Sequence, residues 1–326
     1  MKKIPGMGNA LVDIMIPVND YNLLEQLELP KGSMQLVDKE RSRQIVSLLK
    51  DYPRSQSAGG SVANAIHGIA TLGGKTGYIG AIGEDDLGGF FVRDMINAGV
   101  EPHLIHSAEE TGRAITLVTP DSERTFATYL GAASQLSAIS DHSSLITHHL
   151  YDFFLLEGFL VYDHALAETS LKLACDSGMT VAIDLASYNV VEANREFLHQ
   201  MVEKYVDIVF ANEEEAKAFT GKEPVEALKE ISKMCDIAVV KIGSKGSLIK
   251  QGDEMYEIAA IPAKPVDTTG AGDLFASGFL YGLARELPIR RCGEIGAILA
   301  GNVIEVMGSK MTKSQWDNIR ELLDIH

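Results

Sequence analysis

The sequence Asp267-Thr268-Thr269-Gly270-Ala271-Gly272-Asp273 organises the whole chain. An apolar helix pattern with a wide hydrophobic face begins immediately after it, at Leu274. Glycines just before a helix leave several backbone N–H groups unpaired and pointing the same way, and the helix dipole adds partial positive charge there. The stretch therefore predicts an anion site suited to a phosphate or to the oxyanion of a transition state.

Asp273 falls in the first turn of this helix, where a carboxylate is electrostatically favoured and need not react. One interpretation is therefore a capped helix after a tight turn. A carboxylate placed among anion-binding amides favours another interpretation, because a base beside an anion hole is what phosphoryl transfer to an alcohol requires.

The stretch resembles the second signature, DTxGAGD, of the PfkB-type (ribokinase-like) carbohydrate and nucleoside kinases, with all fixed positions present. The resemblance implies that Asp273 is the base on the acceptor hydroxyl. It implies that the amides of Gly270, Ala271 and Gly272 stabilise the transferring phosphoryl group, and that Thr268 contacts the nucleotide. It also implies ATP and Mg²⁺ as cofactors, and it allows a stimulating monovalent cation.

The composition excludes several other classes of function. The chain has 326 residues, a net charge of −16 and no dense Lys/Arg cluster, so we expect neither nucleic acid nor membrane as a partner. Cys175, Cys235 and Cys292 lie far apart without the spacing of metal ligands, as is typical of reduced thiols in a cytoplasmic protein. No apolar run approaches the roughly 20 residues of a membrane span.

The N-terminal residues 4–16 are predicted to form one strand that carries a Gly-Met-Gly-Asn turn. A dinucleotide fingerprint fails here because Leu11 stands at the position of its third glycine, which argues against a nicotinamide oxidoreductase. Asp13 lies inside the apolar strand and must be hydrogen-bonded or face a ligand. Structural and functional interpretations of Asp13 both stay open.

A second glycine turn, Gly59-Gly60, precedes a predicted helix that runs to about Leu72 and carries Asn64 on its first turn. The simple interpretation is a glycine turn with a solvated Asn. The stretch also resembles the first signature of the same kinase family. That resemblance implies that the acceptor hydroxyls are held by Asn9, Asp13, Gly59, Gly60 and Asn64.

The segments 114–119 and 125–130 are predicted to form a β-hairpin. Such a hairpin is marginal alone, but with strands from residues 15–37 it would form a small sheet, the lid of the family. The resemblance implies that Arg124 contacts the substrate, whereas a solvated loop Arg is the simple alternative. Strand alternation turns only some apolar hairpin residues inward, and the sequence leaves the face open for Ile115, Leu117, Phe126 and Tyr129.

From residue 150 onward, apolar strands alternate with helices, which predicts a mostly parallel sheet with helices on both faces. The predicted fold class is thus α/β and ribokinase-like, with a small β-sheet lid. We expect a large nucleotide- and substrate-binding domain and a small lid, the lid pairing with a second copy or being sealed by its own strand. The expected bounds are 1–15, 38–108 and 131–326 for the large domain, and 16–37 and 109–130 for the lid.

The pair Asn212 and Glu215 follows a predicted strand and resembles the NxxE motif of the family. This implies that Asn212 serves the nucleotide and that Glu215 holds magnesium indirectly, through water. An N-cap Asn followed by first-turn acids explains the same pattern without any ligand.

Two further stretches resemble nucleotide contacts of the family. Gly243 and Gly246 match the x-G-x-x-G loop that follows a strand, although Lys241 stands where a Thr is usual. Asn302 falls where family members place a residue beside the adenine.

We therefore expect a kinase that transfers the γ-phosphate of ATP to a primary hydroxyl of a ribose-containing molecule. The segment Gly8–Asp13 resembles the GNPLLD start of the adenosine kinases, which favours adenosine or a related nucleoside. A kinase of ribose, fructose or a keto-deoxy sugar is the first alternative. A non-catalytic sensor of sugars or nucleosides is the second, and the presence of Asp273, Asn212 and Glu215 argues against it.

Overall fold

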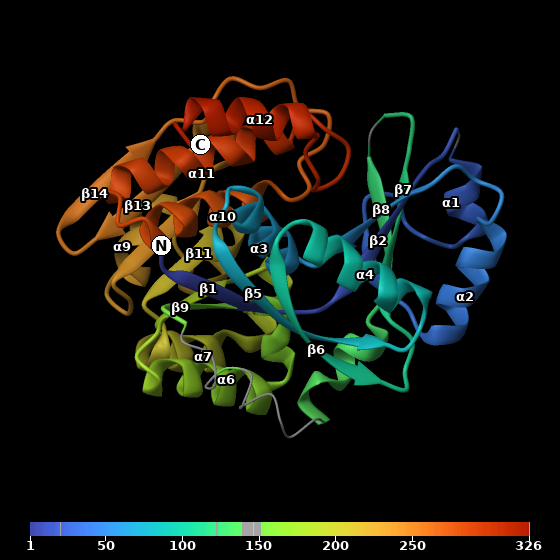
Figure 1. Ribbon diagram of the computed structural model, residues 1–326, viewed down its shortest axis with the longest axis horizontal. Coiled ribbons are helices and arrows are strands. Elements are labelled where there is room, and N and C mark those ends of the chain that lie inside the picture. The colour runs from blue at the N-terminus through green and yellow to red at the C-terminus, as the bar shows by residue number, and fades with distance from the viewer. Residues whose placement is uncertain (20, 122, 139–145, 147–150, 326) are drawn as a thin grey trace.

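The computed structural model describes residues 1–19, 21–121, 123–138, 146 and 151–325 (Figure 1). Within these ranges the strands form a nine-stranded and a five-stranded sheet. In spatial order, the nine-stranded sheet contains β14 (Glu254–Ile258), β13 (Ser247–Gln251), β12 (Ile237–Lys241), β11 (Ile208–Asn212), β10 (Thr180–Asp184), β9 (Phe153–Glu157), β1 (Lys3–Met7), β5 (Lys75–Gly83) and β6 (Val100–Ser107). The five-stranded sheet contains β3 (Met34–Leu36), β8 (Arg124–Tyr129), β7 (Gly112–Val118), β2 (Leu11–Pro17) and β4 (Ser55–Gly59).

The large sheet is parallel except for β13 and β14, which are antiparallel at one edge. Its helices are α3 (Ser61–Thr71), α4 (Asp86–Asn97), α6 (His164–Asp176), α7 (Tyr188–Tyr205), α8 (Glu213–Thr220), α9 (Pro224–Ile231), α10 (Ala271–Ala284), α11 (Ile289–Val303) and α12 (Lys313–Leu322). Adjacent residues of β9 enter opposite cores. Leu155 belongs to the core that also contains residues of α3, α10 and α11, and Leu156 belongs to the core that contains residues of α6 and α7. The predicted sheet with helices on both faces is confirmed (Figure 1).

The N-terminal strand differs from our prediction. The chain does not continue as one strand over residues 4–16, because β1 ends at Met7 and β2 begins at Leu11 in the other sheet. The break occurs where Glu157 crowds Gly8, since a Cβ there would lie 2.4 Å from Glu157 Oε2. Our expected domain bound after residue 15 therefore falls inside β2.

The five-stranded sheet is here called the lid. Its predicted hairpin is present, with β7 and β8 antiparallel, and β2 runs parallel to β7. It also contains β4, whose residues we had expected in the large domain. One face packs with the short helices α1 (Asn22–Gln26) and α2 (Lys39–Leu48), through residues such as Leu24 and Ile45. The protein's own helices thus cover one face of the lid (Figure 1).

Helices α10 and α11 pack so closely that a glycine is needed between them. A Cβ at Gly278 would lie 2.7 Å from the carbonyl oxygen of Ile295 and 2.8 Å from the nitrogen of Gly296. Because both atoms belong to the backbone, a side chain at position 278 requires one helix to move. This contact fixes the spacing of the two helices at the middle of α10.

We expect Gly278→Ala to destabilise the protein by about 1–3 kcal/mol through overpacking. The matched control is Gly89→Ala in the interior of α4, where an added Cβ meets only the flexible end of Arg93. That control should gain up to about 0.5–1 kcal/mol, because Ala restricts the unfolded chain. Urea unfolding of both variants measures the difference, and equal effects at the two positions would contradict the close packing of α10 and α11.

Candidate active site

The N-terminus of α10 has the geometry expected of an anion site. Gly270 caps the helix at φ +78°, in the left-handed region that favours glycine. Leu274 N–H is the first amide to bond back along the helix, to the carbonyl of Gly270 at 2.8 Å. The amides of Gly272 and Asp273 precede that bond, so the first turn presents them outward.

The carboxylate of Asp273 is held by the first turn of α3. It accepts hydrogen bonds from Ser61 Oγ at 2.7 Å and from Asn64 Nδ2 at 3.0 Å. Asn64 Oδ1 in turn accepts from Ser309 Oγ at 2.8 Å. Burial raises the pKa of Asp273 to about 6, against the two hydrogen bonds that lower it. Asp273 is therefore a base that is charged at neutral pH yet close to its pKa, as proton transfer requires.

Asp13 provides a second carboxylate on the lid side. Its carboxyl group lies directly over Gly59, where an added Cβ would be 2.3 Å from Cγ. In the described part of the chain this carboxylate accepts no hydrogen bond. Burial raises the pKa of Asp13 to about 6, while Lys310 lowers it and Asp273 raises it. Asp13 is thus a hydrogen-bond acceptor whose capacity the described protein groups leave unused.

Asn9 and Gly60 lie at the same junction but are engaged within the protein. Asn9 Nδ2 donates to Glu157 Oε1 at 2.7 Å, and Val62 N–H donates to Glu157 Oε2 at 3.2 Å. Gly60, at φ +102°, leaves room for the Asn9 carbonyl, which an added Cβ would meet at 2.2 Å. Burial raises the pKa of Glu157 to about 7. Glu157 therefore joins the end of β1 to the start of α3.

The sequence analysis did not select Glu157. Its only signal in the sequence was its place as an acidic residue at the end of the apolar run that forms β9. All residues of that strand are buried. A charge in that position must be paired or hydrogen-bonded, so the rule for buried polar groups could have found it.

Arg124 fastens the lid to the α10 turn. Its guanidinium forms an ion pair with Asp267 and donates a hydrogen bond to Thr269 Oγ1, and both Arg124 and Asp267 are buried. Asp267 also accepts from the amides of Thr269 and Gly308. Burial lowers the pKa of Arg124 to about 10, and Asp13 opposes this. The contacts of Arg124 in the described chain thus connect the lid with the loop that carries the anion site.

Asn212 and Glu215, predicted to serve the nucleotide and magnesium, lie with Asp184 and Lys241 at the carboxyl ends of β10, β11 and β12. Asn212 and Glu215 form a capping box, with Asn212 Nδ2 donating to Glu215 Oε1 at 2.7 Å. Lys241 Nζ donates to Asp184 Oδ2 at 3.0 Å, and an added Cβ on Gly272 would lie 3.0 Å from the same nitrogen. Lys241 therefore reaches from the sheet to the anion site of α10.

Charge coupling connects this cluster with Asp273. Burial raises the pKa of Glu215 to about 7, and Lys241 lowers it. Burial alone would lower the pKa of Lys241, but Asp184, Glu215 and Asp273 raise it above its ordinary value. The sequence analysis missed Asp184, although the rule that ligands collect at the ends of parallel strands could have selected it.

The remaining residues predicted to contact the nucleotide are Gly243, Gly246, Thr268 and Asn302. Gly243 and Gly246 adopt φ +57° and +99° in the loop after β12, and Gly246 has no room for a side chain against the Ile258 carbonyl. Thr268 is exposed on the loop that leads into α10. Asn302 Nδ2 donates to the Ile298 carbonyl at 2.8 Å, so its amide is bound to its own helix.

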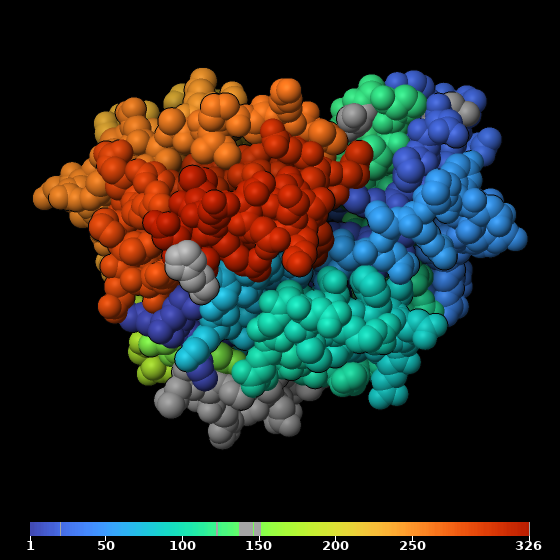
Figure 2. Space-filling model, turned by 45° about the horizontal axis from the view of Figure 1, so that its top comes forward, coloured from blue at the N-terminus to red at the C-terminus, as the bar shows by residue number. Residues whose placement is uncertain are grey.

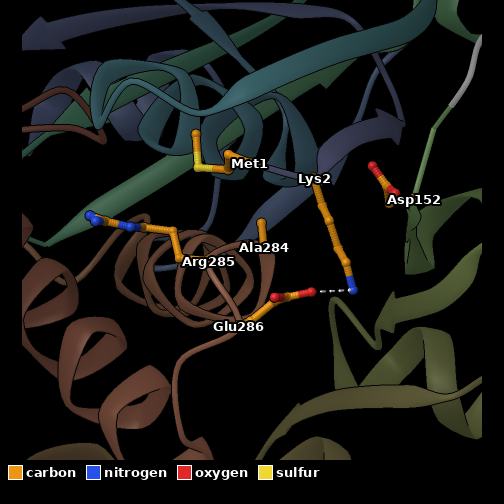
Figure 3. A pocket seen from close by; sticks show the side chains of 6 residues that line it. All are labelled: Met1, Lys2, Asp152, Ala284, Arg285 and Glu286. Carbon is orange, nitrogen blue, oxygen red and sulfur yellow. Dashed lines mark ion pairs between the residues drawn. The ribbon is translucent and has the colours of Figure 1, made fainter.

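A surface pocket elsewhere does not belong to this site. It lies at the opposite end of α10 and is lined by Met1, Lys2, Asp152, Ala284, Arg285 and Glu286 (Figure 3). Lys2 pairs with Glu286 at 3.3 Å, and both side chains are largely exposed. The C-terminal end of a helix repels anions, so this pocket lacks what attracts a phosphate at Gly270.

The geometry is that of a phosphotransferase. A carboxylate whose pKa is close to neutral pH, outward helix amides and a lysine meet at the carboxyl ends of parallel strands. Residues 34–316 match the model for "pfkB family carbohydrate kinase", and the chain belongs to this family. It is a sugar or nucleoside kinase, and use of ATP follows from the family.

Among the residues that the structure describes, none of the helices has the length and apolar character of a membrane span.

Individual relatives carry both kinds of name. The chain is 32% identical to a probable sugar kinase from Rhizobium etli, with a TM-score of 0.87 and coverage of 100% and 99% of the two chains. It is 30% identical to adenosine kinase from Sinorhizobium meliloti, with a TM-score of 0.86 and coverage of 98% and 99%. A nucleoside kinase from Methanocaldococcus jannaschii is 26% identical over 100% of this chain and 98% of its own length. The predicted ribokinase-like fold is confirmed.

We expect Asp273→Asn to fold normally and to lose about 10²–10⁴-fold in kcat, the scale of a lost general base. In the parent enzyme, kcat/KM should fall as the pH drops through about 6, because protonation of Asp273 removes the base. Steady-state kinetics from pH 5 to 8 measure both effects, with circular dichroism as the control for folding. A variant within tenfold of the parent would exclude Asp273 from the chemistry.

Proposed function

We propose that the protein is an ATP- and Mg²⁺-dependent nucleoside kinase that phosphorylates the primary hydroxyl of a ribose, with adenosine or a related purine nucleoside as acceptor. One observation carries the choice of a nucleoside over a free sugar: the character of the lid face that bears Asp13.

The strand pairing shows which lid residues share the face of Asp13. Neighbours in register lie on one face, and so do alternate residues along a strand. Asp13 pairs with Ala114, and two residues further along the pairing joins Met15, Thr116, Phe126 and Met34 into one row. Ile115, Leu117 and Tyr129 therefore lie on the opposite face, toward α1 and α2. Of the four apolar hairpin candidates, only Phe126 shares the face of Asp13.

This row gives the inner lid an apolar shelf beside the Asp13 carboxylate. Phe126 is partly exposed, and its neighbour Met34 is 50% exposed. Met15 contacts the loop of the large domain, because a Cβ at Gly308 would lie 2.8 Å from Met15 Cε. Figure 2 shows a notch between the lid, in blue and green at the upper right, and the orange and red C-terminal part of the chain.

The shelf suits a flat apolar ring. Asp13 and Met15 are two residues apart on one strand, about 7 Å, which matches a ribose hydroxyl and the attached base. Aromatic and methionine side chains pack well against a purine and would contribute binding energy that a free sugar cannot use. A sugar site of the same size would surround the ring with polar groups instead.

The chemistry assigns each residue a role. Asp273 would take the proton of the acceptor hydroxyl. The hydroxyl oxygen would bond to the γ-phosphorus while the bond between that phosphorus and the leaving ADP oxygen breaks. The first amides of α10 would stabilise charge on the transferring phosphoryl group, and Lys241 would add positive charge beside Gly272. The cluster of Glu215, Asp184 and Lys241 fits a cation, because burial disfavours the negative charge of Glu215 and a bound cation would stabilise that charge. Bound Mg²⁺ would neutralise the phosphates, with Glu215 holding it through water.

We expect Asp13→Ala to raise KM for the acceptor by about 10- to 100-fold, since a hydrogen bond to a charged group contributes about 1.5–3 kcal/mol. KM for ATP should stay near the parent value, because the nucleotide-side cluster is untouched. Separate titrations of acceptor and ATP measure the two constants. A parallel rise in both would make Asp13 a structural residue.

Specificity constants for adenosine, inosine, ribose and fructose test the acceptor class. We expect the nucleosides to have the higher kcat/KM, and Phe126→Ser to lower it for nucleosides by about 5- to 30-fold, consistent with an aromatic contact of about 1–2 kcal/mol. The matched control is Tyr129→Phe on the opposite face of the lid, which should preserve the ranking. A free sugar that outperforms both nucleosides would overturn the nucleoside assignment and leave the kinase assignment intact.

A further inference from the structure

Lys310 lies in the loop between α11 and α12, immediately after two residues that line the acceptor side. Gly308 packs against Met15, and Ser309 Oγ donates to Asn64, the side chain that holds Asp273. The chain therefore brings Lys310 to the junction of the lid, α3 and α10. No motif of the sequence selects it.

The ammonium group of Lys310 is buried and has no hydrogen-bond partner among the described residues. Burial lowers its pKa to about 8, and the charges of Asp94, Asp13 and Asp273 oppose that change. A buried ammonium without a partner is costly, so such groups are retained where a ligand or a reaction uses them.

The nearest structural explanation is a partnership with Asp94. Asp94 Oδ2 already accepts a hydrogen bond from the Ala58 amide at 2.9 Å, and the described chain forms no ion pair between Asp94 and Lys310. The other charged or titratable groups that face Lys310 are Asp13 on β2, Asp273 on α10 and His67 on α3. Burial, together with Lys310, holds the pKa of His67 well below its ordinary range, so His67 is neutral.

Asp13 is the complementary group. Its carboxylate can only accept hydrogen bonds and receives none from the described protein, while Lys310 can only donate and has no acceptor. Gly308, two residues before Lys310, packs against Met15, two residues after Asp13, so the loop of Lys310 adjoins the strand of Asp13. Lys310 is also the charge that does most to lower the pKa of Asp13. A vicinal diol satisfies both groups, since its protons bond to the carboxylate and its oxygen lone pairs accept from the ammonium.

We propose that Lys310 is a specificity-determining residue that donates a hydrogen bond to a hydroxyl oxygen of the acceptor's vicinal diol, while Asp13 accepts the hydroxyl protons. The inference rests on the proposed function for the identity of the diol, the 2′- and 3′-hydroxyls of a ribonucleoside. It gives the enzyme a means to prefer ribosides over deoxyribosides, because removing one hydroxyl leaves a buried charged group without its partner.

The test compares Lys310→Met with the parent on adenosine, 2′-deoxyadenosine and 3′-deoxyadenosine at saturating ATP. We expect the parent to prefer adenosine, and Lys310→Met to lose about 10- to 100-fold in kcat/KM on adenosine but far less on at least one deoxy analogue. KM for ATP should not change. Lys313→Met, at an exposed lysine that begins α12, is the matched control and should keep the parent preference.

Thermal unfolding separates this role from a structural one. Lys310→Met should keep or raise the Tm, because an apolar chain of similar length replaces a buried unpaired charge. An equal loss on all three acceptors, or a lower Tm with the riboside preference intact, would overturn the proposal. If the parent prefers a free sugar, the nucleoside assignment fails, and the same comparison with that sugar and its deoxy analogues still tests Lys310.

Discussion

The site depends on the hydrogen bonds that join the Asp273 carboxylate to Ser61 and Asn64. These bonds bring the N-termini of α3 and α10 to one point, although the residues lie more than 200 positions apart in the chain. Each helix begins at a glycine with positive φ, so both point the positive end of a dipole toward the same space. Burial raises the pKa of Asp273, and the hydrogen bonds from α3 keep its carboxylate charged at neutral pH.

The two aspartates at the ends of the organising heptapeptide do different work because their surroundings differ. Asp267 is buried against Arg124 of the lid and accepts two backbone amides, so its charge is fully engaged. Asp273, six residues later, accepts hydrogen bonds from the neutral side chains of Ser61 and Asn64 and stays available to a hydroxyl proton. The same turn therefore anchors the lid at one end and holds the candidate base at the other.

The sequence was informative where a local pattern determines the backbone. Glycine turns before helices, the apolar strands from residue 150 onward and the hairpin follow from short-range rules, and these predictions are confirmed. The break between β1 and β2 was missed because it depends on Glu157, which is nearly 150 residues distant. The face of Phe126 could not be assigned either, because it follows from pairing with β2 and β3 rather than from alternation within the hairpin.

Site residues outside the motifs were missed for the same reason. Asp184, Glu157 and Lys310 matter through partners brought together by the sheet, and none of them has a distinctive neighbour in sequence. Asn212 and Arg124 show the opposite limit. Their positions were predicted, and an N-cap was one of the two interpretations of Asn212. The described chain has the capping box of Asn212 and an ion pair of Arg124 with Asp267, and the motif of Arg124 did not reveal this ion pair.

The two lysines explain how one site could treat its two substrates differently. Lys241 is neutralised in part by Asp184 and held against Gly272, so its position is fixed before any phosphate arrives, as an invariant donor requires. Lys310 has no such partner in the part of the chain that the structure describes, and its charge is costly until an acceptor with correctly placed oxygens enters. The cost of this buried, unpaired ammonium discriminates among acceptors, because only a substrate that accepts a hydrogen bond from Lys310 removes it. Preorganisation on the phosphate side and an unsatisfied donor on the acceptor side are therefore two physical solutions to two different demands, transition-state stabilisation and selectivity.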